Sequence, residues 1–278
     1  MTSPWVLAPL RLSALAPFRP SAPFAPEWSL HPSVLIGVAA LAALYVWGIL
    51  VARRRFALGP PVAPWRPLCF GAGLAVMLVS LNGPIHDLSD NYLFSIHMAQ
   101  HLLLTMVLPP LLIAGVPGWL VEPALRRQAV RSLARFLVHP VVAGALFSVT
   151  LVFWHTVDAY DLMMRNHGVH VVTHLTFMVT AVLLWWPVMS PAPSLPRLGP
   201  GLGMLYLFVI QLPMQLLGAI ITFADDPLYT WYLAAPRTWG LSPLDDQKLG
   251  GLLMWVPGNL WIWGAMSLLF FEWARKDR

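Results

Sequence analysis

The chain has 278 residues, of which 58% are hydrophobic and only 10% are charged, and its formal net charge is +5. Soluble domains hold roughly 45–50% apolar and about 25% charged residues. The composition therefore excludes an ordinary soluble protein and indicates an integral membrane protein in contact with the lipid bilayer. The excess positive charge lies mainly between apolar runs, and we expect no nucleic-acid partner.

The first 32 residues contain seven prolines and only a broken apolar stretch. A secretory signal has an unbroken apolar core and a small-residue cleavage site. We therefore expect 1–32 to be a flexible or interfacial N-terminal arm that the mature protein keeps. The single cysteine, Cys69, excludes an intrachain disulfide and a two-thiol metal site.

Seven apolar runs of about 18–23 residues follow the arm, and each is long enough to cross roughly 30 Å of hydrocarbon as a helix. The sequence predicts an all-α fold, a polytopic integral membrane helical bundle with seven transmembrane helices. We expect one transmembrane domain, 33–272, and a basic cytoplasmic tail, 273–278. The spans are expected near 33–52, 67–85, 93–114, 140–157, 168–189, 201–223 and 250–271.

The charges between these runs predict the orientation of the chain. Short cytoplasmic loops hold an excess of Lys and Arg. Twelve of the seventeen basic residues lie in segments that share one side of a seven-span chain, whereas nine of the twelve acidic residues lie on the other. We therefore expect the N-terminus outside and the C-terminus in the cytoplasm.

Two connecting segments have a distinctive composition. Residues 121–138 place apolar side chains against four arginines, and we expect one helix along the anionic inner membrane surface. The outer loop 224–249 holds four aromatic residues and four aspartates and is long for a simple connector. We interpret it as a lid at the membrane interface.

Eight of the nine histidines fall in the predicted outer half of the molecule, and only His139 lies on the cytoplasmic side. Ionisable side chains within a membrane are costly and tend to be functional. The eight are His31, His86, His97, His101, His155, His167, His170 and His174.

Helix geometry arranges four of these histidines into two pairs. Residues four apart lie on one helix face, about 6 Å apart along the axis, so His97 and His101 point the same way, as do His170 and His174. Neutral imidazole is a common ligand of transition metals. We therefore predict that these four histidines form a metal site between spans three and five, with His155 or His167 as the added ligand.

Other interpretations of these residues remain open. A membrane histidine can simply form a hydrogen bond to a neighbouring helix, and a row of histidines can conduct protons. Most of the methionines are expected to pack in the core, although one or two could be ligands because soft thioethers suit reduced copper. The methionines considered are Met98, Met106, Met163, Met164, Met214 and Met254.

Four strings of the chain resemble the CtaG family of membrane proteins, which are assembly factors of caa(3)-type cytochrome c oxidase. The resemblance runs from about residue 33 to 272 and leaves out the proline-rich arm. The strings are HMAQHLLLTMVLPPLLIAGVP (97–117), FWHTVDAYD (153–161), HGVHVVTHLTF (167–177) and LSPLDDQKLGGLLMWVPG (241–258).

The resemblance implies a multi-pass protein of the bacterial cytoplasmic (inner) membrane that helps to mature a haem–copper oxidase. It implies a copper ion bound at the outer face, with the oxidase subunits and extracytoplasmic (periplasmic) copper donors as partners. We therefore expect a metal-binding assembly factor rather than an enzyme. The alternative is a membrane di-iron or haem-dependent oxidoreductase that uses the same histidine cluster.

The predicted topology can be tested with reporter fusions. Fusions at Arg55, Arg131 and Arg197 should report the cytoplasm, because all three follow the positive-inside rule. Fusions after Asp161 or near Ala235 should report the outside. An outside signal from any of the first three would mean that the span count is wrong.

Overall fold

The computed structural model describes residues 30–237 and 239–276, and within these ranges the chain is helical and contains no strand. The helices of the first half are α1 (Pro32–Trp47), the π-helix η1 (Gly48–Ala52), α2 (Arg53–Arg55), α3 (Trp65–Ser80), α4 (Gly83–Asn91), α5 (Phe94–Leu102), the π-helix η2 (Leu103–Val107) and α6 (Leu108–Gly115). Those of the second half are α7 (Gly118–Leu125), α8 (Gln128–Leu137), α9 (Pro140–Trp154), α10 (Val157–Arg165), α11 (His167–Met189), α12 (Pro200–Thr222), α13 (Thr230–Leu233) and α14 (Pro243–Lys276).

Five helical stretches of the described chain are long and apolar enough to cross a membrane. Two bent helix pairs, α3 with α4 and α8 with α9, pass the same test only when each pair is taken as one span, so the number of candidate spans is five to seven. The predicted all-α fold is confirmed for the described residues, and the long apolar helices support a membrane protein. The predicted orientation of the chain remains a prediction. The count of seven remains a prediction.

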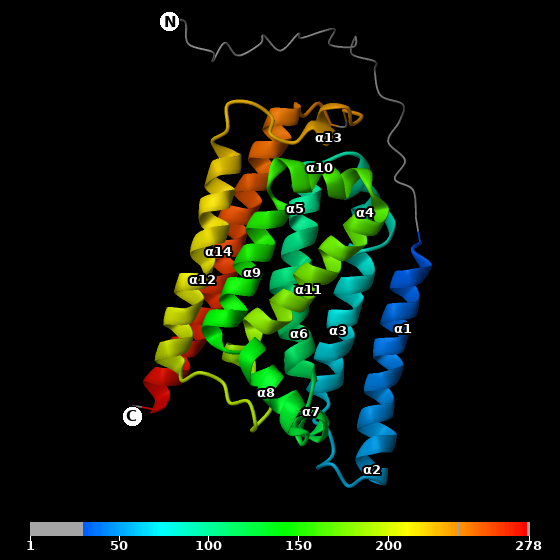
Figure 1. The fold of residues 1–278 in the computed structure, drawn as a ribbon, viewed down its shortest axis with the longest axis vertical. Coiled ribbons are helices and arrows are strands. Elements are labelled where there is room, and N and C mark those ends of the chain that lie inside the picture. The colour runs from blue at the N-terminus through cyan, green and yellow to red at the C-terminus, as the bar shows by residue number, and fades with distance from the viewer. Residues whose placement is uncertain (1–29, 238, 277–278) are drawn as a thin grey trace, which may run out of the picture.

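The long helices stand side by side, and short helices cover the two ends of the bundle (Figure 1). Helices α4, α10 and α13 lie at one end, which we call the histidine end. Helices α2, α7 and α8 lie at the other end with the last turns of α14 (Figure 1). The basic residues of α2, α8 and α14 therefore share one end of the molecule.

The predicted span 67–85 is divided by a bend of 44° between α3 and α4. Asn82 is extended and Gly83 has a φ of +64°, a conformation that glycine adopts without steric cost. The bend turns α4 across the end of the bundle. As a result, the polar face of α4 lies beside α5 and α11 rather than continuing along the direction of α3.

Residues 121–138 form two helices rather than the one that we expected. Arg127 is extended, with φ of −75° and ψ of 120°, and separates α7 from α8. The Arg131 side chain donates from Nε to the carbonyl oxygen of Leu125 at 2.9 Å, which supplies a partner at the end of α7.

The third predicted span contains a π-helix directly after His101. Pro109 has no N–H, so the carbonyl of Thr105 has no helical partner. The indole Nε1 of Trp185 on α11 donates to this carbonyl at 2.9 Å. The Thr105 hydroxyl donates in turn to the carbonyl of His101 at 2.7 Å. The distortion is thus fixed by specific contacts between two histidine-bearing helices.

Helix α14 begins at Pro243, seven residues before the predicted span, and one of the aspartates in its first turn caps another helix. Asp246 is fully buried. Its carboxylate accepts hydrogen bonds from the backbone N–H of Phe94 at 2.7 Å and of Ser95 at 3.1 Å. The Ser95 hydroxyl donates to the same carboxylate at 2.5 Å. The acidic sequence of this segment is therefore part of a helix and not of the outer loop.

Helices α12 and α14 pack closely through glycines. A Cβ added at Gly251 would lie 2.5 Å from Thr222 Oγ1 and 2.8 Å from the carbonyl oxygen of Gly218, so only glycine fits there. Nearer the middle, Gln215 donates to Asn259 at 2.6 Å. Polar residues within two apolar helices thus join α12 to α14.

The Asp246 cap generates a prediction about stability. Asp246→Ala should lower the thermal unfolding midpoint of the detergent-purified protein, because it leaves buried N–H groups of α5 unpaired, at a cost of about 1–3 kcal/mol for each group. Asp245→Ala is the matched control, because Asp245 is exposed and its described partner is Ser242 in the same turn. Equal midpoints for the two variants would contradict the role of Asp246.

Candidate metal centre

The two predicted histidine pairs face each other near the histidine end. The Nε2 atoms of His97 and His101 on α5 lie 3.0 Å apart. The His97 ring centroid lies 5.5 Å from that of His170 and 6.0 Å from that of His174, both on α11. The His101 and His174 rings are 5.5 Å apart, and all four residues are buried. The structure thus brings the four histidines together, whereas metal binding by them remains a prediction.

An aspartate that was not predicted as a ligand forms, with two of the histidines, a group that could hold a metal ion. One ligand atom each from Asp90, His97 and His170 lie within 4.8 Å of one another. Asp90 comes from α4, and its Oδ2 lies 3.4 Å from His170 Nδ1. The sequence feature that could have identified Asp90 is its position four residues after His86 on a short polar helix. This spacing places both side chains on one helix face.

His86 and Gln100 lie beside this triad. Gln100 is fully buried, and its Nε2 donates to the carbonyl of Ser80 at 2.6 Å and to His86 Nδ1 at 3.2 Å. Because Nδ1 of His86 accepts, its Nε2 carries the proton. That Nε2 lies 3.4 Å from Asp90 Oδ2. The carboxylate of Asp90 therefore lies between two imidazoles, one from α4 and one from α11.

The outer loop covers the site through Tyr232 of α13. Burial raises the pKa of the Tyr232 phenol, so the hydroxyl keeps its one proton and donates it to the carbonyl of Ser89 at 2.5 Å. The Tyr232 oxygen accepts from the Tyr160 hydroxyl at 3.3 Å. It therefore also accepts from His97 Nδ1, at 3.2 Å. His97 carries its proton on Nδ1 and has a lone pair on Nε2.

Other residues of the same loop hold it against the site. Trp231 donates from Nε1 to the carbonyl of Asp90 at 2.7 Å, and Tyr229 donates to the carbonyl of His155 at 3.0 Å. Tyr229 also stacks on Phe94, with ring centroids 4.9 Å apart. The loop lies over the histidines, as expected of a lid, and it contacts α4, α5 and the end of α9.

Three buried nitrogens of α11 have no hydrogen-bond partner among the described residues. They are Nε2 of His170 and both ring nitrogens of His174. Buried polar atoms in native proteins nearly always have a partner, and an exception calls for an explanation such as an ion or a water. Such unpaired imidazole nitrogens fit a site that receives a metal ion.

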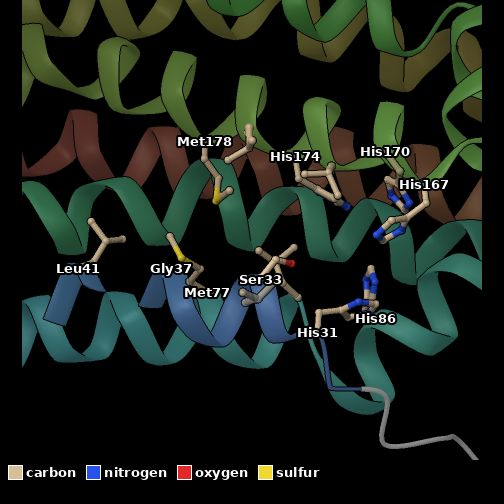
Figure 2. A pocket seen from close by; sticks show the side chains of 14 residues that line it. His31, Ser33, Gly37, Leu41, Met77, His86, His167, His170, His174 and Met178 are labelled. Atoms are coloured by element: carbon tan, nitrogen blue, oxygen red, sulfur yellow. The ribbon is translucent and has the colours of Figure 1, made fainter. Parts of the chain in front are cut away.

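A cavity of about 320 Å³ extends from the site toward α1. His31, at the start of α1, lies at its histidine end. Its ring centroid is 4.5 Å from that of His86 and 5.9 Å from that of His167. Figure 2 shows these three rings with His170 and His174, and shows Met77 and Met178 farther along the cavity. Burial, followed by the neighbouring His167, lowers the pKa of His31 and favours its neutral form.

The two histidines that we expected as additional ligands lie apart from the triad. His167 is exposed at the start of α11 and contacts His31. His155 is buried at the end of α9, with its ring centroid 5.8 Å from that of His101. Neither belongs to the group of Asp90, His97 and His170. His31, which falls in the predicted N-terminal arm, instead packs beside the cluster.

Comparison with known proteins gives a family and three relatives. The family model described as cytochrome c oxidase caa3 assembly factor (Caa3_CtaG) matches residues 43–276. Uncharacterized proteins of Mycobacterium bovis and Mycobacterium tuberculosis are each 28% identical over 266 residues, which cover 88% of this chain and 39% of the relative. An uncharacterized protein of Mycobacterium leprae is 27% identical over 202 residues, 66% of this chain and 30% of the relative.

The chain thus spans less than half the length of these curated relatives. No solved structure matches it. The family match includes α4, α5 and α11, which supply the triad, and the loop that covers it. The resemblance seen in the sequence is confirmed: this chain belongs to the cytochrome c oxidase caa3 assembly factor (Caa3_CtaG) family.

Proposed function

We propose that the protein binds a copper ion as cargo at Asp90, His97 and His170 and supports metallation of a haem–copper oxidase. The observation that carries this proposal is the set of buried imidazole nitrogens on His170 and His174, unpaired among the described residues, near the partly buried carboxylate of Asp90. Family membership supports the assembly role. We further infer that the site faces outward from a bacterial cytoplasmic membrane, toward extracytoplasmic copper donors and the oxidase subunits.

The spacing of the triad is compatible with an ion after a small closing motion. Metal–nitrogen bonds of about 2.0–2.1 Å place two ligand atoms of one ion roughly 3.3–4.2 Å apart. The triad atoms lie within 4.8 Å of one another. Side-chain rotations that move the ligand atoms by about an ångström would bring them to the spacing of ligands around one ion. His174 lies near enough to become a further ligand.

The electrostatics of the site also support a cation. Buried imidazoles are favoured in the neutral form that binds metals, so the ligands do not repel the ion. The Asp90 carboxylate supplies the negative charge that offsets part of the cost of a buried positive charge. The tyrosine contact fixes the proton of His97 on Nδ1, which leaves Nε2 for the ion.

The cavity beside α1 suggests how cargo could enter and leave. Tyr232 and Trp231 cover the site from the histidine end, whereas the cavity reaches His86, His170 and His174 from the side of α1. An assembly factor must be able to release its ion to a partner site that binds the ion more tightly. A lateral opening allows exchange without displacement of the loop.

The first prediction from this proposal concerns metal binding. Asp90→Asn combined with His170→Leu should weaken binding of Cu²⁺ to the purified protein by about 10–100-fold or more, because two of the three triad ligands are lost. Titration with a copper(II) salt, followed by electron paramagnetic resonance, measures this. His139→Leu is the control, because His139 is exposed and lies away from the triad.

Metal analysis and the absorption spectrum of the native protein distinguish the alternatives. Copper supports the proposal. Two irons per chain, or a haem Soret band, would contradict it and favour the oxidoreductase. Unchanged Cu²⁺ affinity in the double variant would place the copper elsewhere.

The second prediction concerns the oxidase. Replacement of His97 and His101 by Leu should preserve membrane insertion, since it makes the helix more apolar, yet it should lower oxidase activity in cells grown with little copper. Added copper should partly restore activity by mass action. Activity of a His139→Leu strain should stay near normal. Full oxidase activity in low copper, with normal amounts of the double variant, would refute a delivery role.

A further inference from the structure

A second, smaller cavity lies deeper in the bundle, on the other side of His101. Its volume is about 20 Å³, close to the space that one water-sized sphere needs. Methionines from three different helices line it, namely Met98 of α5, Met214 of α12 and Met254 of α14, together with His101 and His155. Each of the three methionines is at most 4% exposed.

His155, which lines this cavity, carries a lone pair with no partner among the described residues. Its Nδ1 lies 2.8 Å from the carbonyl oxygen of Leu151. A carbonyl only accepts, so Nδ1 carries the proton and Nε2 carries the lone pair. Nε2 is buried and has no partner among the described residues. A backbone carbonyl that holds one imidazole nitrogen in this way is the usual support of a metal-binding histidine.

His101 presents a second lone pair by the same reasoning. Because Tyr232 holds the proton of His97 on Nδ1, His97 Nε2 is an acceptor. His101 Nε2 lies 3.0 Å from it and must be the donor. The proton of the neutral His101 ring is therefore on Nε2, and its Nδ1 is bare. This Nδ1 is also buried and unpaired among the described residues.

The donor set of the small cavity differs from that of the outer triad. The two lone-pair nitrogens come from rings 5.8 Å apart, and the sulfur donors are neutral thioethers. Among the described residues, no carboxylate lines the cavity. Thioether and imidazole ligands select soft ions such as Cu⁺. Without a counter-charge, a monovalent ion costs far less to bury than a divalent one. A water molecule could pair with the nitrogens but would gain little from the sulfurs.

We infer that His101, His155, Met98, Met214 and Met254 form a second, inner site for a soft monovalent metal ion, Cu⁺. The ligands of the inner site differ from those of the outer triad, although both sites use residues of helix α5. The inner site does not require the outer triad to bind metal. Three helices and the end of a fourth would converge on the ion. The methionines are then ligands as well as core residues.

The inner site can be tested in a protein whose outer triad has been disabled. In an Asp90→Asn, His170→Leu background, Ag⁺ serves as a redox-inert probe of soft monovalent sites. We expect one Ag⁺ per chain in isothermal titration of the purified full-length protein. Additional Met214→Leu and Met254→Leu changes should abolish this binding. Leu replaces Met with little change in volume, so folding should be retained.

The matched control replaces Met106 and Met163 by Leu in the same background, because both are buried but do not line the cavity. This variant should keep its Ag⁺ site. Equal Ag⁺ binding by the two methionine variants, or no binding in the background protein, would overturn the inference. Because only the inner residues change, this outcome is separate from any failure of Cu²⁺ to bind the outer triad.

Selenomethionine provides a measurement that needs no substitution. X-ray absorption of the labelled protein loaded with Cu⁺ should show selenium neighbours at the copper edge. Copper surrounded by nitrogen and oxygen alone would exclude the inner site even if every variant failed to fold.

Discussion

The position of every candidate ligand on α5 depends on the contact between Asp246 and the first turn of that helix. A carboxylate at a helix N-terminus satisfies free N–H groups and interacts favourably with the helix dipole. Here it comes from a residue about 150 positions later in the chain. One helical turn after Asp246, a Cβ at Gly250 would lie 2.4 Å from the Phe94 ring, so α14 can approach only because glycine stands there. The cap and the glycine together fix the height and rotation of α5, and with them His97 and His101.

A second constraint is which ring nitrogen carries the proton in each histidine of the cluster. A buried polar network that is only partly satisfied costs free energy. Each hydrogen bond in the cluster therefore restricts which atom of the next group can donate or accept. The phenol of Tyr232 decides the tautomer of His97, and His97 decides that of His101. Gln100 does the same for His86. Among the described residues, imidazole nitrogens without a partner remain on His170 and His174 of α11, and on His101 and His155 beside the methionine-lined cavity. Residues that touch no ion would thus determine which atoms can bind one.

The sequence predicted those parts of the molecule that depend on local spacing. Apolar runs show helices, and four-residue spacing places His97 with His101 and His170 with His174 on common faces. It did not indicate Asp90 as a ligand, because Asp90 reaches the site only through the bend at Asn82 and Gly83. Nor did it place His31 beside His86, since that contact joins residues from separate helices. The start of α14 was assigned to the loop because a buried, capping aspartate has the same sequence signature as an exposed one.

The contact between His97 and His101 makes the two candidate sites depend on each other. An ion at the outer triad that took the lone pair of His97 Nε2 would remove the acceptor of His101 Nε2, which lies 3.0 Å away. His101 would then gain by moving its proton to Nδ1, because Nε2 could itself face the ion. That proton would point toward the methionine cavity and remove one nitrogen ligand from the inner site. Occupation of either site would therefore disfavour the other, and the coupling is reciprocal by thermodynamic necessity. Such opposition would suit transfer of a single ion, because an ion held at one site would weaken the binding of a second ion at the other.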